Sequence, residues 1–252
     1  SSNVELNLFK DDTSLDINFA AYENLNKDTD KFEFIAPSLD YNSNLFYSEK
    51  YGDFNFKSSS YHKIFNTNIK ETFLINDFLW KSNNFISNSG LVSSFEGNIK
   101  NINYETTKST THKNDNVEVS PVVAFKSSYP LRKENQESDK ILSPMLMLRY
   151  APISMNDLSD SQLKLNTENL FTLNKLDNLN IESGANLTLG LDYSKYDKVK
   201  NLNKLEASFG QVYRLSKNSK MPIQSSLGQK TSELVGKALY NFNQESNISY
   251  KY

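Results

Sequence analysis

Few side chains in this sequence are of the types that catalyse reactions or hold metals. There is no cysteine, and the only histidines are His62 and His112. His62 lies two residues after Ser60, and a serine hydrolase needs a histidine beside its serine. Serine is so common in this chain that this adjacency carries little information. Two histidines without carboxylates at ligand spacing also argue against a dedicated zinc site.

Carboxylates gather in one polar stretch, where Asp157, Asp160 and Glu168 could offer oxygen ligands to Ca²⁺. Their spacing matches no calcium-loop signature, so a solvated acidic patch is the favoured interpretation. The 28 basic and 30 acidic residues give a net charge of −2, without the basic footprint of a nucleic-acid-binding protein. We therefore predict no catalytic residue, no cofactor, no metal site and no nucleic-acid partner; the chain is not an enzyme.

The composition is poor in apolar residues for a soluble domain of this length. Counted without Tyr and with Gly, the apolar share is roughly 35%, against about 45–50% in average globular proteins. Disorder is disfavoured because 12% of the residues are aromatic and the net charge is small. A barrel with a wet inner face fits better. The abundance of Asn, and of Lys over Arg, is interpreted as genomic composition.

Alternation of apolar and polar residues with period two is the dominant pattern. It is clearest in segments 4–9, 15–21, 117–125, 187–193 and 207–214. No apolar run is long enough for a transmembrane helix, but membrane β-strands need only about 9–11 residues. We predict about twelve strands and no convincing helix. Pro121 and Pro144 fall inside predicted strands, which predicts a bulge or break at each.

The lengths of the polar connections alternate along the chain. Those near 105–116, 153–184 and 216–229 are long, and those near 194–203 and 243–246 are shorter. Outer-membrane barrels have long extracellular loops and short periplasmic turns. The connection 127–140 departs from this scheme, because it is long although it falls on the side where the scheme expects short periplasmic turns. Tyrosines and Trp80 near strand ends fit either an interfacial aromatic girdle or ordinary strand propensity.

These patterns predict an all-β fold, namely a segment of an antiparallel transmembrane β-barrel. We expect a single domain over residues 1–252 with a long extracellular-type loop at 153–184. The start Ser1-Ser2-Asn3-Val4 has no leader features, so we expect an excised piece of a larger barrel, forming an incomplete, open and curved sheet.

The central residues resemble the LptD (OstA) family of LPS-assembly proteins. The run from Ile141 to Pro152 is similar to a strand of that family, and short motifs follow it in the family's order over about 95 residues. The motif residues that we take as loop or lumen candidates are Asp160, Ser161, Asn169, Leu170, Phe171, Asn174, Glu182, Gly184, Gly210, Gln211 and Tyr213. One departure is Asn178-Leu179-Asn180-Ile181, which stands where the family has Gly-x-Asp-Arg, so a contact that pins the loop is in doubt.

The resemblance implies a translocon in the Gram-negative outer membrane that inserts lipopolysaccharide into the outer leaflet. Its implied partners are lipopolysaccharide, outer-membrane lipid, an LptE-type lipoprotein plug, and a periplasmic Lpt bridge reached through an N-terminal domain absent here. The gate strands are expected to lie outside this chain. The alternatives are a substrate-specific porin or receptor barrel, and a non-membrane all-β surface adhesin.

We further expect the loop 153–184 to fold over or into the lumen as a lid, anchored on the wall by Leu170 and Phe171. In the strand that follows, Leu187, Leu189 and Leu191 should share one face, with Thr188, Gly190 and Asp192 on the other. Asp192 should point to the lumen, because a charge facing lipid is costly.

Overall fold

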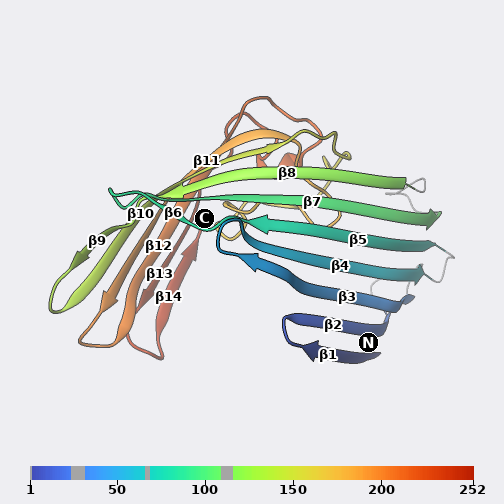
Figure 1. Ribbon diagram of the computed structural model, residues 1–252, viewed down its shortest axis with the longest axis horizontal. Coiled ribbons are helices and arrows are strands. Elements are labelled where there is room, and N and C mark those ends of the chain that lie inside the picture. The colour runs from blue at the N-terminus through green and yellow to red at the C-terminus, as the bar shows by residue number, and fades with distance from the viewer. Residues whose placement is uncertain (1, 24–31, 66–68, 109–115) are drawn as a thin grey trace. The chain divides into compact units, whose positions relative to one another are not determined.

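The computed structural model describes residues 2–23, 32–65, 69–108 and 116–252, and most of them form one antiparallel β-sheet (Figure 1). Twelve strands follow one another along the sheet in the order β1-β2-β3-β4-β5-β7-β8-β10-β11-β12-β13-β14. Two short strands lie off this path, with β6 paired to β7 and β9 paired to β10. The strands are β1 (Ser2–Lys10), β2 (Thr13–Glu23), β3 (Phe32–Ser48), β4 (Gly52–Phe65), β5 (Lys70–Lys81), β6 (Phe85–Ile86), β7 (Val92–Thr107), β8 (Asn116–Ser128), β9 (Leu131–Glu134), β10 (Ser138–Ala151), β11 (Gly184–Asp197), β12 (Leu202–Arg214), β13 (Val235–Asn241) and β14 (Asn247–Lys251).

The predicted all-β antiparallel sheet is confirmed. The path begins at β1 and ends at β14, and these two strands each have one neighbour, so the sheet is not closed. The only helical turn among the described residues is the 3₁₀ element η1 (Ile223–Ser225). Within the described ranges, no helix has the length and apolar character needed to cross a membrane.

The chain divides into two compact units. The N-terminal unit comprises Ser1–Lys81 and Asn98–Pro121, and the C-terminal unit comprises Ser82–Gly97 and Val122–Tyr252. The long strands β7 and β8 contribute residues to both units.

In the N-terminal unit, one face of the sheet is apolar. The register of β4 and β5 places Phe54 opposite Trp80 and Phe56 opposite Phe78. Their rings lie 6.4 Å and 4.7 Å apart between centroids, and half of the Phe78 surface is exposed. Cross-strand aromatic pairs of this kind stabilise a sheet while leaving an apolar surface uncovered.

The opposite face of the N-terminal unit, which we call its polar face, carries charged pairs beside the buried apolar side chains of Phe73 and Ile75. Lys57 lies opposite Asp77 in the register, and the Asp77 carboxylate accepts a 2.7 Å ion-pair contact from Lys100 of β7. Another ion pair joins Lys63 of β4 to Glu33 of β3 at 3.0 Å. Successive residues of a strand face opposite sides, so the charged groups of this unit lie on one face and the exposed aromatic side chains on the other.

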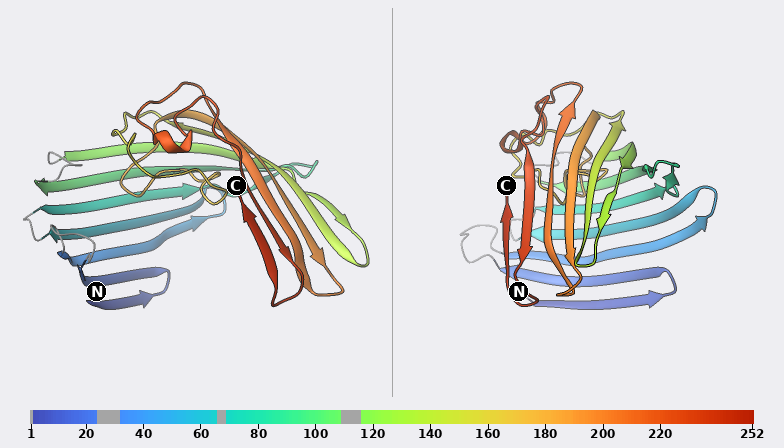
Figure 2. Two further views of the ribbon diagram at one scale, coloured as in Figure 1. Left: turned by 180° about the vertical axis from the view of Figure 1, so that it is seen from behind. Right: turned by 90° about the vertical axis from the view of Figure 1, so that its left-hand side faces the viewer.

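The C-terminal unit also has two different faces, but one of them is covered. Along β10 the exposed fraction alternates sharply: Met147 is 0% and Arg149 2% exposed, whereas Leu148 is 50% and Tyr150 52% exposed. The cover consists of two chain segments, the long loop (residues 152–183) between β10 and β11, and the 215–234 segment between β12 and β13 (Figure 2). We call this side the covered face and the other side the open face.

The prediction for the strand after the long loop is confirmed by the register. On the open face Leu187 lies opposite Leu148 and Leu189 opposite Leu146. Thr188 therefore points to the covered face, where it is fully buried.

The connections within the C-terminal unit follow the predicted alternation. The long loop and the 215–234 segment connect the strands at one end, and the short turns 198–201 and 242–246 connect them at the other end. The long connection 127–140 contains β9, whose residues 131–134 pair with β10, so it is an extension of the sheet.

The predicted bulge or break at Pro144 is found on one side of β10 only. On the other side, β10 pairs with β11 through this residue without a register shift. β10 pairs with β8 up to Met145 and with β9 from Leu142, and Pro144 stands between them. Its missing N–H is thereby placed where no ladder bond is needed. β8 likewise runs through Pro121 as one strand.

Spin labels placed one at a time along residues 186–193 test this arrangement in lipid. A label at Leu189 should be reached by a lipid-soluble quencher, because it lies on the open face. A label at Asp192 should be reached by a water-soluble quencher, and one at Thr188 by neither, because the cover excludes both media. A profile without alternation along the strand would contradict the two-face assignment.

Candidate functional site

The long loop is held on the covered face by an apolar cluster. Its buried members come from the loop, β12, the 215–234 segment and β13: Met155, Leu165, Leu170, Val212, Met221, Leu227 and Val235. A second, smaller cluster joins the wall to the two ends of the loop through Val122, Ala151 and Ile181. Burial of these side chains supplies the main driving force for docking the loop, at about 1.5–3 kcal/mol for each fully buried large residue.

Leu170 and Phe171 occupy a depression made by two glycines. Gly190 of β11 and Gly210 of β12 are cross-strand partners on the covered face. A Cβ added at Gly210 would lie 2.6 Å from a Leu170 methyl carbon, and one at Gly190 would lie 2.7 Å from the Phe171 ring. The two side chains therefore fill the space that a larger residue at either glycine would occupy.

At the base of the loop, Glu182 is fully buried among basic residues. Arg214, at the end of β12, forms an ion pair with the Glu182 carboxylate and donates a second hydrogen bond to the Ser183 carbonyl. Arg149, at the end of β10, donates to the Glu182 carbonyl at 2.7 Å and to the Leu173 carbonyl. Asn186 donates to the same carboxylate at 2.7 Å. One residue thus ties the loop to three strands.

The fourth charged group is Lys175, which is 1% exposed. Its Nζ lies 3.8 Å from Glu182 Oε2, which is too far for a hydrogen bond, and it has no hydrogen-bond partner among the described residues. Three cations therefore surround one carboxylate. The cluster, Arg149, Lys175, Glu182 and Arg214, carries an excess of buried positive charge.

Burial and charge act in opposite directions on Glu182. Burial favours the neutral acid, but the positive charges of Lys175, Arg149 and Arg214 outweigh it and lower the pKa of Glu182. Burial lowers the pKa of Lys175, and the attraction of Glu182 only partly offsets this effect. The carboxylate is thus held in its charged form, whereas burial disfavours the charged form of the lysine.

Asparagine side chains satisfy the backbone of the loop. Asn174 donates to the carbonyls of Asp177 and Asn180, both at 2.7 Å, and its carbonyl oxygen accepts from the Glu182 N–H at 3.3 Å. Asn180 in turn donates to Asp177 at 2.8 Å. These bonds lie where the family pattern has Gly-x-Asp-Arg, so asparagine bonds pin this part of the loop. Asn169 donates to the carbonyls of Lys164 and Lys175.

The other motif residues predicted from the sequence are more dispersed. Gly184 begins β11 with a φ of 87°, a backbone conformation that glycine adopts without strain. Ser161 caps a turn through a 3.3 Å bond from Leu163 N–H, and Asp160 is exposed in the loop. Gln211 and Tyr213 lie on the open face, where the tyrosine donates to the glutamine at 2.7 Å.

The remaining chemical candidates do not assemble into a site. His62 contacts Thr72 at 2.7 Å on the exposed surface of the N-terminal unit, and His112 lies outside the described residues. Glu168 pairs with Lys251 at 3.0 Å, and Asp157 accepts a bond from the Ser159 N–H. Within the described part of the chain, no three His, Asp or Glu side chains are grouped so that they could hold a metal ion.

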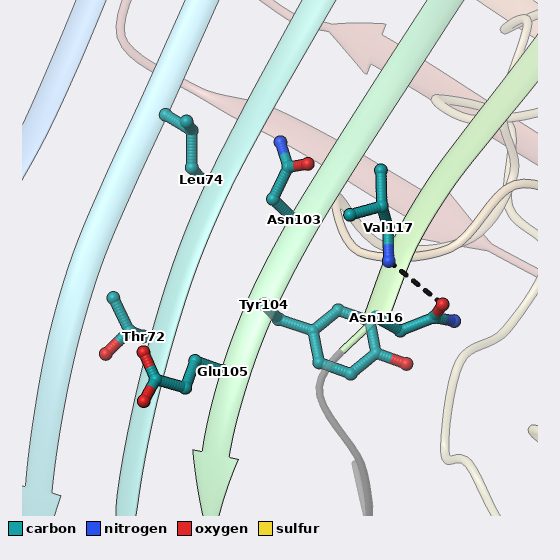
Figure 3. A pocket seen from close by; sticks show the side chains of 7 residues that line it. All are labelled: Thr72, Leu74, Asn103, Tyr104, Glu105, Asn116 and Val117. Atoms are coloured by element: carbon teal, nitrogen blue, oxygen red, sulfur yellow. Dashed lines mark hydrogen bonds between the residues drawn. The ribbon is translucent and has the colours of Figure 1, made fainter.

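A groove of about 510 Å³ lies in the N-terminal unit (Figure 3). Its lining comes from β5, β7 and the first residues of β8: Thr72, Leu74, Asn103, Tyr104, Glu105, Asn116 and Val117. Leu74 and Val117 are largely exposed there, and the Val117 N–H is satisfied by the Asn116 side chain at 2.9 Å. The groove is wide and open, and its polar side chains do not converge on one point. It differs in this respect from a typical small-molecule site, which is concave and has a few convergent polar groups.

The sequence interpretation missed Arg149, Lys175 and Arg214 as site residues. A signal was present, because the chain has only three arginines: Arg214 is the last residue of β12, and Arg149 lies two residues before the end of β10. Strand alternation alone would have placed Arg149 on the side of the sheet opposite Leu148.

A single-layer, open, antiparallel sheet with an apolar face and a loop docked on its other face fits the β-barrel class. Within that class, this chain belongs to the LptD family, because the family model described as LPS transport system D matches residues 2–252. Membership connects the chain with lipopolysaccharide transport at the outer membrane of Gram-negative bacteria. No curated protein matches the sequence.

Substitution of Gly210, one of the two glycines that form the depression, tests the close contact between the loop and the strands. Gly210→Ala should destabilise the protein by about 1–3 kcal/mol, because the new methyl group would meet the Leu189 carbonyl oxygen at 2.5 Å as well as Leu170. Gly236→Ala is the matched control, since its Cβ would have ordinary contacts at 3.5 Å. The free energy of unfolding in detergent measures both. Equal effects would contradict the close approach.

The charge cluster predicts opposite results for two of its members. Glu182→Gln should cost about 3–5 kcal/mol, because it leaves buried cations without their counter-ion. Lys175→Met should be neutral or stabilising, since it removes a buried charge that has no hydrogen bond.

The control is Glu168→Gln, which breaks an exposed ion pair and should change stability little. Denaturant unfolding of the three variants in one detergent gives the comparison. A strong loss of stability in Lys175→Met would show that the lysine is a supporting member of the cluster.

Proposed function

We propose that this chain forms part of the barrel wall of an outer-membrane translocon that inserts lipopolysaccharide into the outer leaflet. The observation that carries the proposal is the match of the LptD family model to residues 2–252, on a sheet whose two faces differ in polarity. The apolar faces of the strands would contact lipid, and the polar face of the N-terminal unit would line an aqueous lumen for the sugars. Such transport needs no covalent chemistry by the protein.

The docked loop gives the C-terminal unit a different role in this proposal. Its covered face is dry, so sugars would not move directly along β10, β11 and β12. The loop instead acts as a fixed lid on the inner side of the wall, held by the apolar cluster and by the buried ions around Glu182. In the proposal, its asparagines and exposed carboxylates form the surface that faces the lumen.

The partners follow from family resemblance and are proposed on that basis. They are lipopolysaccharide as the cargo, the surrounding outer-membrane lipid, a lipoprotein of the LptE type as a lumen plug, and a periplasmic Lpt bridge that delivers the cargo. The family match supports the cargo and the transport system in general terms.

Depletion of the protein that contains this chain tests the proposed insertion step. Newly labelled lipopolysaccharide should stop reaching the surface of intact cells, where a surface-added antibody detects it. Re-expression of the wild type should restore delivery. Normal surface delivery in depleted cells would contradict the proposal.

The lid is tested in the same cells with Leu170→Ala/Phe171→Ala. These substitutions remove one buried anchor, Leu170, worth about 2–5 kcal/mol, and one partly buried anchor, Phe171, and should weaken exclusion of detergents and large antibiotics. The matched control is Leu215→Ala/Ile223→Ala, which truncates apolar residues that are 81% and 75% exposed. Equal antibiotic exclusion by both double variants would exclude the anchoring role.

A further inference from the structure

A pocket of about 280 Å³ lies at the end of β12 and the start of β11, and its lining comes from the long loop, the 215–234 segment and these strand ends. It is partly open to solvent, and its size is near the lower end of the range for small-molecule sites. It lies entirely within the C-terminal unit. Its lining residues are Ser154, Met155, Ser183, Gly184, Arg214, Ser216, Lys217, Asn218 and Lys220.

The lining carries three cations and no carboxylate. Two acids interact with lining cations: Glu182, which pairs with Arg214, and Asp157, which interacts electrostatically with Lys220. Even with both counted, positive charges exceed negative ones by one. The pocket is therefore electropositive, whereas the chain as a whole has a net charge of −2.

Two of the three cations, Arg214 and Lys220, are held by contacts with their neighbours, namely an ion pair and a hydrogen bond to a carbonyl. Arg214 has a side chain only 3% exposed, and its Nε has no hydrogen-bond partner among the described residues. The side chain of Asn218 spans the floor, where it donates to Ser183 Oγ at 3.0 Å. It also accepts from the Lys220 N–H at 3.0 Å and so fixes the turn that presents this lysine.

Two of the cations keep donors for a ligand. Lys220 donates one hydrogen bond from Nζ to the Met155 carbonyl at 3.0 Å, and an ammonium group has three donors. Lys217 is exposed at the mouth, and its side chain has no ion pair with another described residue. Ser154, Ser183 and Ser216 add hydroxyl groups suited to sugar oxygens.

We propose that this pocket binds a phosphate group carried on a sugar, and that lipopolysaccharide is the source of that phosphorylated sugar. Lysine ammonium groups form strong charge-assisted hydrogen bonds with phosphate oxygens, and a buried arginine adds a fixed positive charge. The volume leaves room for the sugar ring beside the phosphate. The assignment of the source rests on the proposed transport function, while the phosphate site itself rests on the pocket.

Binding to the purified full chain in a nonionic detergent tests the site. Calorimetric titration with glucosamine 1-phosphate should give saturable binding, and titration with glucosamine should give none. Lys217→Gln/Lys220→Gln should weaken binding of the phosphorylated ligand, with a dissociation constant raised about tenfold for each lysine removed. Arg214 is left intact because it also supports the buried cluster.

The control is Lys164→Gln/Lys230→Gln, which removes two exposed lysines outside the pocket, one from the long loop and one from the 215–234 segment that holds Lys217 and Lys220. The control should keep wild-type affinity, and both variants should keep the wild-type unfolding midpoint. Equal weakening in both double variants, or no saturable binding to the wild type, would overturn the site.

Two further titrations identify the source of the phosphate. Inorganic phosphate should bind more weakly than the sugar ester, and phosphatidylglycerol vesicles should show no dependence on Lys217 and Lys220. Equal binding of inorganic phosphate, or loss of vesicle binding in the pocket variant, would refute the sugar-phosphate assignment.

If the ester fails to bind while depleted cells still lose surface lipopolysaccharide, the site fails and the transport function stands. The reverse pattern would leave an anion site in a protein with another role.

Discussion

The C-terminal unit depends on one buried carboxylate and the cations around it. Glu182 has no exposed surface, and it receives bonds from Arg214 and Asn186 while its own carbonyl accepts from Arg149. Because an isolated buried charge is very costly, these partners must all be in place for the loop to dock. Docking then makes the face of three strands dry. The docked loop also fills the glycine depression and forms one side of the pocket at the strand ends.

The two units solve the same problem in different ways. In each, strand alternation separates an apolar face from a face with polar groups. The N-terminal unit leaves its polar groups in cross-strand ion pairs such as Lys100 with Asp77, without a docked loop among the described residues. The C-terminal unit buries its polar groups under a loop whose backbone is satisfied by asparagine side chains rather than by a ladder. The two units therefore satisfy the polar groups of one sheet face differently, by cross-strand ion pairs in the N-terminal unit and by a docked loop in the C-terminal unit.

The sheet was accessible from the sequence because period-two alternation is local information. Leu187, Leu189 and Leu191 needed only their spacing to be placed on one face. The partnerships of Glu182 could not be read in this way, since Arg149 and Arg214 are 33 and 32 residues away in sequence. Asparagine richness was interpreted as genomic composition, yet several of these side chains bind the loop backbone. Composition counts residues and cannot show which backbone groups they satisfy.

The paired positions of Arg149, Asn186 and Arg214 have a consequence for how the strands align. These residues are neighbours across β10, β11 and β12 only in the observed register. A slip of one residue would turn an arginine onto the apolar open face, away from its buried partners. The same slip would also separate Gly190 from Gly210 and leave the loop without its seat. The site on which the loop docks therefore exists only when the three strands have the observed register.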